Sequence, residues 1–150
     1  MKNELLEINN STGEILIPCE NEEETKNIKI TKIKALNLLA RSDFCLINGT
    51  WEAKRDALIK ILSSLPISYS WEIKERKMTD TYSEILGELS VSTGKIVRKA
   101  QSMGICEYSE LKGNGGLHFM NARAETRALK RAIEVLFGSV INYYVIKYLN

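Results

Sequence analysis

The sequence predicts an α+β fold in which a three-stranded antiparallel β-meander is crossed by a long amphipathic helix (β-β-β-α). Two observations predict it. Residues 67–110 alternate apolar and polar side chains in three runs separated by short turn signals, which is typical of strands with one buried face. Residues 121–138 then repeat apolar residues with the period of a helix. A chain of 150 residues is long enough for one domain with a single core.

Charge divides the chain into two parts. The net charge is +2, yet residues 1–26 hold seven glutamates against Lys2 and Lys26. We therefore predict an acidic N-terminal leader over 1–26, consisting of a hairpin and then a mobile connector, and a basic domain over 27–150. A basic domain behind an acidic leader suggests an anionic partner, although solubility alone explains the same charge equally well.

Additional N-terminal helices are expected between the leader and the meander. Thr31 is expected to cap a short helix over 31–43, and residues 44–49 are expected to be extended. Thr50 is expected to cap a clearer helix over 51–65, which carries Trp51 in its apolar stripe and ends before Pro66.

The three strands of the meander are expected over 67–77, 81–91 and 95–110. In the first, Ile67, Tyr69, Trp71 and Ile73 are expected on the buried face, with Lys74 and Arg76 extending the wet face. Gly104 is expected to bend the third strand. These strands are joined in sequence by short turns, and such turns predict antiparallel neighbours.

The helix over 121–138 carries two distinct sides. One side is apolar and rich in small residues, so it can lie close against a sheet. The other is a contiguous basic arc of Arg123, Arg127, Lys130 and Arg131, with Glu134 spaced to pair with Lys130 or Arg131. Arginine suits bidentate phosphate contacts, which favours phosphate binding modestly over the alternative of a solvated helix face.

The stretch "ARAETRALKRAIEVLFG" resembles the signature helix of the Rad-fifty-two family of single-strand annealing proteins. The pattern is filled by residues in order along the helix, namely Ala124, Thr126, Leu129, Lys130, Arg131, Ala132, Phe137 and Gly138. The order of elements is also similar, with a helix ending in Leu-Pro, the strand "SYSWEI", two further strands and then this helix. The resemblance covers roughly residues 50–149.

This resemblance implies a homo-oligomeric ring or helical arc that holds single-stranded DNA in a basic groove and anneals it to a complementary strand. The DNA-binding pair of the family's helix corresponds to Lys130 and Arg131. Where members of the family usually have a further basic residue, this chain has Glu134, so Arg127 or Arg123 is expected to compensate. Lys74 and Arg76 are weaker DNA-binding candidates, for which a solvated surface is the favoured interpretation.

The residues alone leave two questions undecided, the partner of Glu125 and the structure of the tail. Glu125 falls on the apolar side of the helix, so it is expected to be paired if buried, by a strand arginine such as Arg98 or by a neighbouring subunit. The tail over 139–150 fits a helix or a strand by periodicity, and the resemblance favours a short helix beside a neighbouring subunit.

Several classes of function are disfavoured by the sequence. There is no P-loop, no nucleophile–base pair and no spacing typical of a metal site, so we expect no enzyme activity, no cofactor, no metal and no small-molecule substrate. The N-terminus is too acidic for a signal peptide and no uninterrupted apolar run is long enough for a membrane span, which predicts an intracellular (cytoplasmic) protein. The composition weakly favours a virus, a plasmid or a prokaryote with AT-rich DNA.

Two other functions remain open at this stage. One is a module that binds and protects single strands or DNA ends without annealing them. The other is a structural oligomer whose basic helix seats an acidic partner, such as the glutamates of its own leader.

Overall fold

The computed structural model describes residues 6–18, 28–34, 38–93, 96–113 and 115–150. Three antiparallel sheets and two α-helices account for most of them. The sheets are β1 (Glu7–Ile8), β2 (Glu14–Pro18) and β3 (Ile28–Lys34); β4 (Phe44–Ile47) and β5 (Thr50–Ala53); and β6 (Ser68–Met78), β7 (Tyr82–Thr93) and β8 (Ile96–Glu107). The helices are α2 (Arg55–Ser64) and α3 (Leu117–Tyr144), with short turns η2 (Arg41–Asp43), η3 (Tyr108–Leu111) and η4 (Val145–Leu149).

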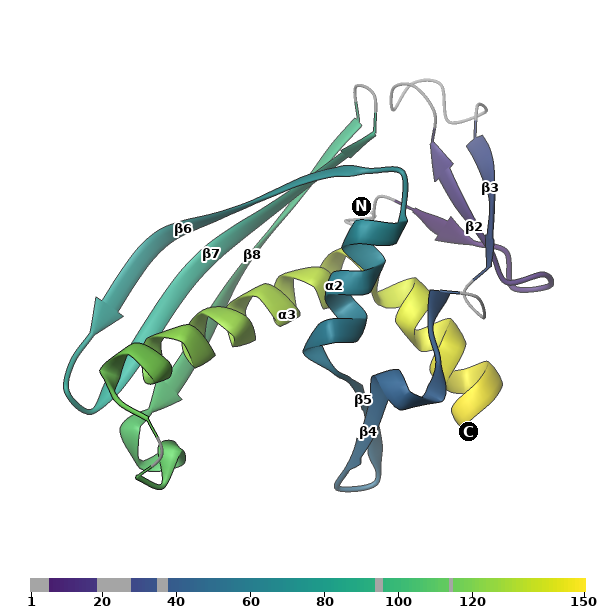
Figure 1. Cartoon of the computed structure of the whole chain (residues 1–150). Coiled ribbons are helices and arrows are strands. Elements are labelled where there is room, and N and C mark those ends of the chain that lie inside the picture. The colour runs from purple at the N-terminus through teal and green to yellow at the C-terminus, as the bar shows by residue number, and fades with distance from the viewer. Residues whose placement is uncertain (1–5, 19–27, 35–37, 94–95, 114) are drawn as a thin grey trace.

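The predicted β-β-β-α arrangement is confirmed. β6, β7 and β8 pair in sequence order, and α3 runs across one face of this sheet (Figure 1). Alternate residues of β7 are buried beneath the helix, including Ile85, Leu89 and Val91, while Glu84 and Glu88 lie on the face that points away from it. The period-2 pattern therefore separates a covered face from a solvated face, as expected for an antiparallel sheet.

The small residues of α3 allow it to lie close against β8. Ala124, Ala128 and Ala132 are fully buried, and the Ser102 hydroxyl donates a hydrogen bond to the Ala128 carbonyl. Gly104 of β8 lies directly beneath this part of the helix, where an added Cβ would overlap the backbone of Ala124 and Ala128. Gly104 was expected to bend the strand; its evident role is instead to admit the helix backbone.

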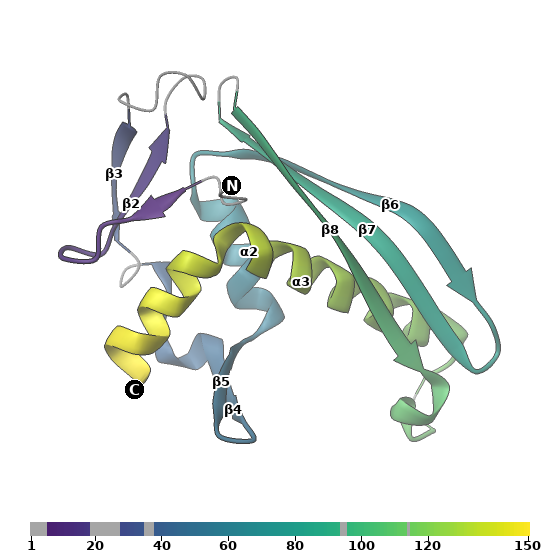
Figure 2. The same cartoon turned by 180° about the vertical axis from the view of Figure 1, so that it is seen from behind.

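α3 is kinked at Phe137, a buried residue whose backbone leaves the helical region (φ −127°, ψ 17°). Beyond the kink, the helix leaves the large sheet and packs with the N-terminal elements (Figures 1 and 2). There Tyr144 stacks on Phe44 of β4 with ring centroids 5.2 Å apart, and Leu6 and Ile15 join the same core. The tail, undecided from the sequence, is therefore helical.

By length and composition alone, the segment Leu117–Leu149 would be able to cross a membrane. Ten side chains of α3 are buried in the domain, whereas Val135, Ile146 and Tyr148 of the same segment are exposed.

Two of the expected helix boundaries are wrong. Residues 28–34 form β3, so a helix does not begin at Thr31; residues 35–37 of that expected helix lie outside the described part. Thr50 begins strand β5 rather than capping a helix, and α2 starts later, with Lys54 as its N-cap. The extended segment expected before Thr50 is confirmed as β4, and the helix does end before Pro66.

The β-hairpin expected in the leader is formed by β1 and β2. The connector expected after it, over residues 19–26, lies outside the described residues. β2 also pairs with β3, so the hairpin is part of a three-stranded sheet rather than a separate unit.

The burial of side chains on the edge strand β6 differs from the prediction. Tyr69 is 49% exposed, although the alternation predicted it to be buried. Trp71 lies over Gly87 of β7, and its indole N–H donates to the Glu125 carboxylate at 3.3 Å. Within the chain, the partner of Glu125 is therefore Trp71 and not the expected strand arginine, while a partner from a neighbouring subunit stays a prediction.

Candidate nucleic-acid interface

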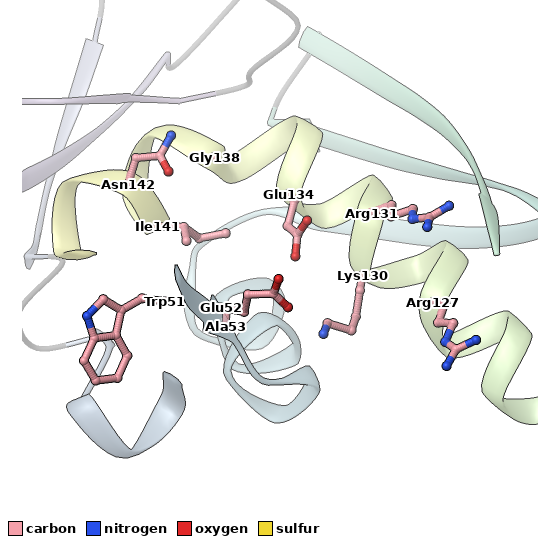
Figure 3. A pocket seen from close by; sticks show the side chains of 10 residues that line it. All are labelled: Trp51, Glu52, Ala53, Arg127, Lys130, Arg131, Glu134, Gly138, Ile141 and Asn142. Carbon is pink, nitrogen blue, oxygen red and sulfur yellow. The ribbon is translucent and has the colours of Figure 1, made fainter. Parts of the chain in front are cut away.

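The basic arc of α3 borders an open pocket of about 460 Å³ (Figure 3). The floor is α3 itself, on both sides of the kink, and the opposite wall is strand β5 of the β4–β5 hairpin. Seven lining residues come from α3, namely Arg127, Lys130, Arg131, Glu134, Gly138, Ile141 and Asn142. Three come from β5, namely Trp51, Glu52 and Ala53. We refer to this pocket as the α3–β5 groove. Three of the six residues predicted to bind DNA thus lie together in it.

Arg127 is held by an acidic partner. Its guanidinium makes two contacts with the Glu110 carboxylate, at 2.7 Å and 3.1 Å, and also donates to the Ile105 carbonyl at 2.6 Å. This bidentate pair, together with the backbone N–H of Glu107, lowers the pKa of Glu110 to about 2. Arg127 is therefore largely neutralised within its own chain.

Arg131 and Lys130 are less constrained. Arg131 donates one hydrogen bond to the Met103 carbonyl at 2.7 Å, and it remains exposed. Lys130 makes no hydrogen bond or ion pair with any residue that the structure describes. Because neither side chain has a carboxylate partner among the described residues, Lys130 and Arg131 are the members of the basic arc best placed to bind an anion.

Two carboxylates also lie in the α3–β5 groove. Glu134 was spaced to pair with Lys130 or Arg131, but no ion pair forms among the described residues. Burial raises the pKa of Glu134, Lys130 and Arg131 lower it, and Glu52 of β5 raises it further. The net direction is upward, so the groove contains an acid that is harder to ionise than usual.

The other three predicted residues lie apart from this groove. Arg123 stacks its guanidinium over the Phe119 ring at 5.4 Å, nearer the start of α3. Lys74 pairs with Glu72 at 3.1 Å and with Glu88 at 3.7 Å, and these acids raise its pKa. Because Glu88 lies on the sheet face away from α3, Lys74 does too, so it belongs to a different surface.

Arg76 lies beyond a β-bulge in β6. It borders a second, smaller pocket of about 220 Å³ that it shares with Glu75, Lys77, Glu84, Leu86 and Met103. This pocket lies on the β6–β7 part of the sheet and contains two acids, Glu75 and Glu84, beside its two bases, Arg76 and Lys77.

Trp51 and Glu52 are groove residues that the sequence interpretation missed. Both were assigned to a packing helix, but they lie in β5, after a turn in which Asn48 and Gly49 have φ of 50° and 79°. An Asn-Gly pair between extended segments is the strongest local signal for a hairpin, and it was present in "FCLINGTWEA". The ring of Trp51 is partly exposed and lies under the Arg41 guanidinium at 5.3 Å.

The described residues contain no group of three or more His, Cys, Asp or Glu side chains that could hold a metal ion. Cys45 and Cys106 are free thiols, and burial raises the pKa of Cys106, which keeps it protonated. Comparisons of the chain with protein-family models and with curated proteins find no match.

Proposed function

We propose that the chain binds single-stranded DNA in the α3–β5 groove and promotes annealing of complementary strands, as a homo-oligomer. The observation that carries this proposal is Lys130, an ammonium without an ion-pair partner among the described residues, next to Arg131 on a rigid helix. Phosphate contacts from a rigid element hold the backbone and leave base edges free to pair. The resemblance of this helix to that of the Rad-fifty-two family supports the same function.

The pocket also favours a single strand. Trp51 lies at one end of the α3–β5 groove, whereas Arg127 and Lys130 lie toward the other (Figure 3). A partly exposed indole beside a cationic surface is a common arrangement for binding unpaired nucleotides, since every base can stack on an aromatic ring. One such ring would hold a base while leaving its neighbours available for pairing.

Binding can be followed through Trp51 itself. The chain has two tryptophans and six tyrosines, so Trp71→Phe leaves Trp51 as the sole tryptophan, and excitation at the long-wavelength edge of the absorption band selects it over the tyrosines. Titration with an oligo-thymidine should quench its emission, and in the same samples labelled complementary oligonucleotides should anneal faster than without protein. Lys130→Ala with Arg131→Ala should reduce both effects. Lys74→Ala is the matched control, because this lysine lies on the other surface and is already paired.

The outcomes separate the alternatives. Tight binding without faster annealing would support the alternative that the protein binds and protects single strands without annealing them. Absence of binding by the wild-type chain would overturn the proposal and favour an acidic protein partner for the basic helix, a type of contact already made by Glu110 with Arg127. Light scattering with and without the oligonucleotide tests the homo-oligomer.

A further inference from the structure

Two carboxylates face each other inside a groove that is otherwise built for anions. Glu134 comes from α3 and Glu52 from β5, and Figure 3 shows their side chains directed toward one another across the α3–β5 groove. Their charges interact, since Glu52 opposes ionisation of Glu134. The groups that share this space are Lys130 and Arg131 from α3, with Arg127 a turn further along.

Neither carboxylate is neutralised by an ion pair with a described residue. Lys130 is spaced one turn before Glu134, which is a favourable spacing for a helical pair, yet the two groups do not come within ion-pair distance. Both walls of the groove, α3 and β5, thus present a carboxylate where a phosphate chain would pass. A carboxylate close to a phosphate repels it, and the repulsion is strong when the groups are partly desolvated.

We propose that Glu52 and Glu134 set how tightly the α3–β5 groove holds a phosphate backbone, and that Glu134 takes up a proton when DNA binds. This inference rests on the proposed function. The ionised pair weakens the grip that Lys130 and Arg131 provide, which keeps the bound strand exchangeable. An annealing protein needs such reversibility, because the paired product must leave the groove.

The direction of the pH dependence follows from the same geometry. Burial and Glu52 already raise the pKa of Glu134 in the free protein. A phosphate in the groove adds a further negative charge beside the carboxylate, so the bound state raises this pKa more. Protons are therefore taken up on binding, and affinity increases as the pH falls toward the pKa of the carboxyl group.

The test is a set of binding curves for an oligo-thymidine with wild type, Glu134→Gln, Glu52→Gln and the double variant. Glutamine keeps the size of the side chain and removes its charge. Glu134→Gln should bind tighter at neutral pH by about fivefold, the effect of one phosphate contact at about 0.1 M salt. Measurements at about pH 7.5 and about pH 5.5 and constant ionic strength should show a gain on acidification in the wild type that the double variant lacks.

Glu75→Gln is the matched control, since Glu75 is an exposed carboxylate on β6, outside the α3–β5 groove. Thermal unfolding of each variant checks that the fold is intact. If both single variants bind like wild type while Lys130→Ala binds weakly, the carboxylates lie outside the DNA path and this inference fails, while the proposed function stands. A pH dependence that persists in the double variant would overturn proton uptake by Glu134. No binding by any form would overturn both proposals.

Discussion

Replacing Lys130 should weaken binding of single-stranded DNA more than replacing Arg127, although both residues lie in the same basic arc. Lys130 has no hydrogen-bond or ion-pair partner among the described residues, so its full charge is available to a phosphate. Arg127 already makes a bidentate pair with Glu110 and a hydrogen bond to the Ile105 carbonyl. The two substitutions therefore separate a DNA contact from a structural contact.

The magnitude follows from counterion release. Each phosphate contact on a single strand contributes about 0.7 to the slope of log affinity against log salt, which corresponds to about fivefold in affinity at about 0.1 M salt relative to about 1 M. Lys130→Ala should lose about one contact per subunit engaged. Arg127→Ala should lose less, because its guanidinium is already held by Glu110 and the Ile105 carbonyl and makes no phosphate contact. Combined with Glu110→Gln, which removes the carboxylate left without its counter-charge, it should lose almost nothing, since the net charge of the pair was already near zero.

Arg127→Ala should instead lower stability. Loss of a half-exposed ion pair costs about 1 kcal/mol, which for a chain of this size is about 2–4 °C in Tm. The assay is a salt titration with a short oligo-thymidine for both variants, alongside thermal unfolding. The reasoning is refuted if Arg127→Ala loses as much affinity and as much salt slope as Lys130→Ala while its Tm stays at the wild-type value.

Two further predictions concern the fold. Gly104→Ala should destabilise the chain by about 3 kcal/mol, the upper end for overpacking, because the added methyl group meets the backbone of α3. Gly116→Ala is the control, since nothing lies within 4 Å of the added methyl group, and it should leave Tm nearly unchanged. Equal Tm values for the two variants would contradict the close approach of α3 to Gly104. Glu110 has a lowered pKa, so its pairing with Arg127 stabilises the fold above about pH 4.3, the unfolded value, and this contribution is lost as pH falls toward about 2. Acid titration of stability should show the loss in wild type and not in Glu110→Gln, whose stability at neutral pH should be lower by about 1 kcal/mol; a wild-type curve that matches the variant would rule the contribution out.

The sequence predicted the parts of the fold that depend on long, regular patterns. The alternation in β7 and the alanine-rich side of α3 are each repeated several times, so the pattern outweighs local exceptions. The elements it missed are short. β3 begins with "IKITKI", whose β-branched residues favour a strand, but an apparent helical spacing further along was given more weight.

The candidate site was predicted in part. The arc of Arg127, Lys130 and Arg131 follows from helix geometry alone, and the structure gathers these residues in one groove. Helix geometry does not show which of these cations already has a partner. Glu110 is 17 residues away from Arg127 in the sequence and reaches it only because η3 folds against α3. The opposite wall, with Trp51 and Glu52, depended on recognising the Asn-Gly hairpin.

The packing of α3 against both the large sheet and the N-terminal core has a consequence for biosynthesis. Strands β6–β8 leave the ribosome before the helix that covers them, so the apolar face around Ile85 and Leu89 stays open until α3 follows. The N-terminal hairpins cannot complete their packing either until their core partner Tyr144, far along the chain, has been synthesised. Folding of this domain is therefore complete only after α3 has left the ribosome, and a ribosome stalled within α3 would carry an aggregation-prone, protease-sensitive chain.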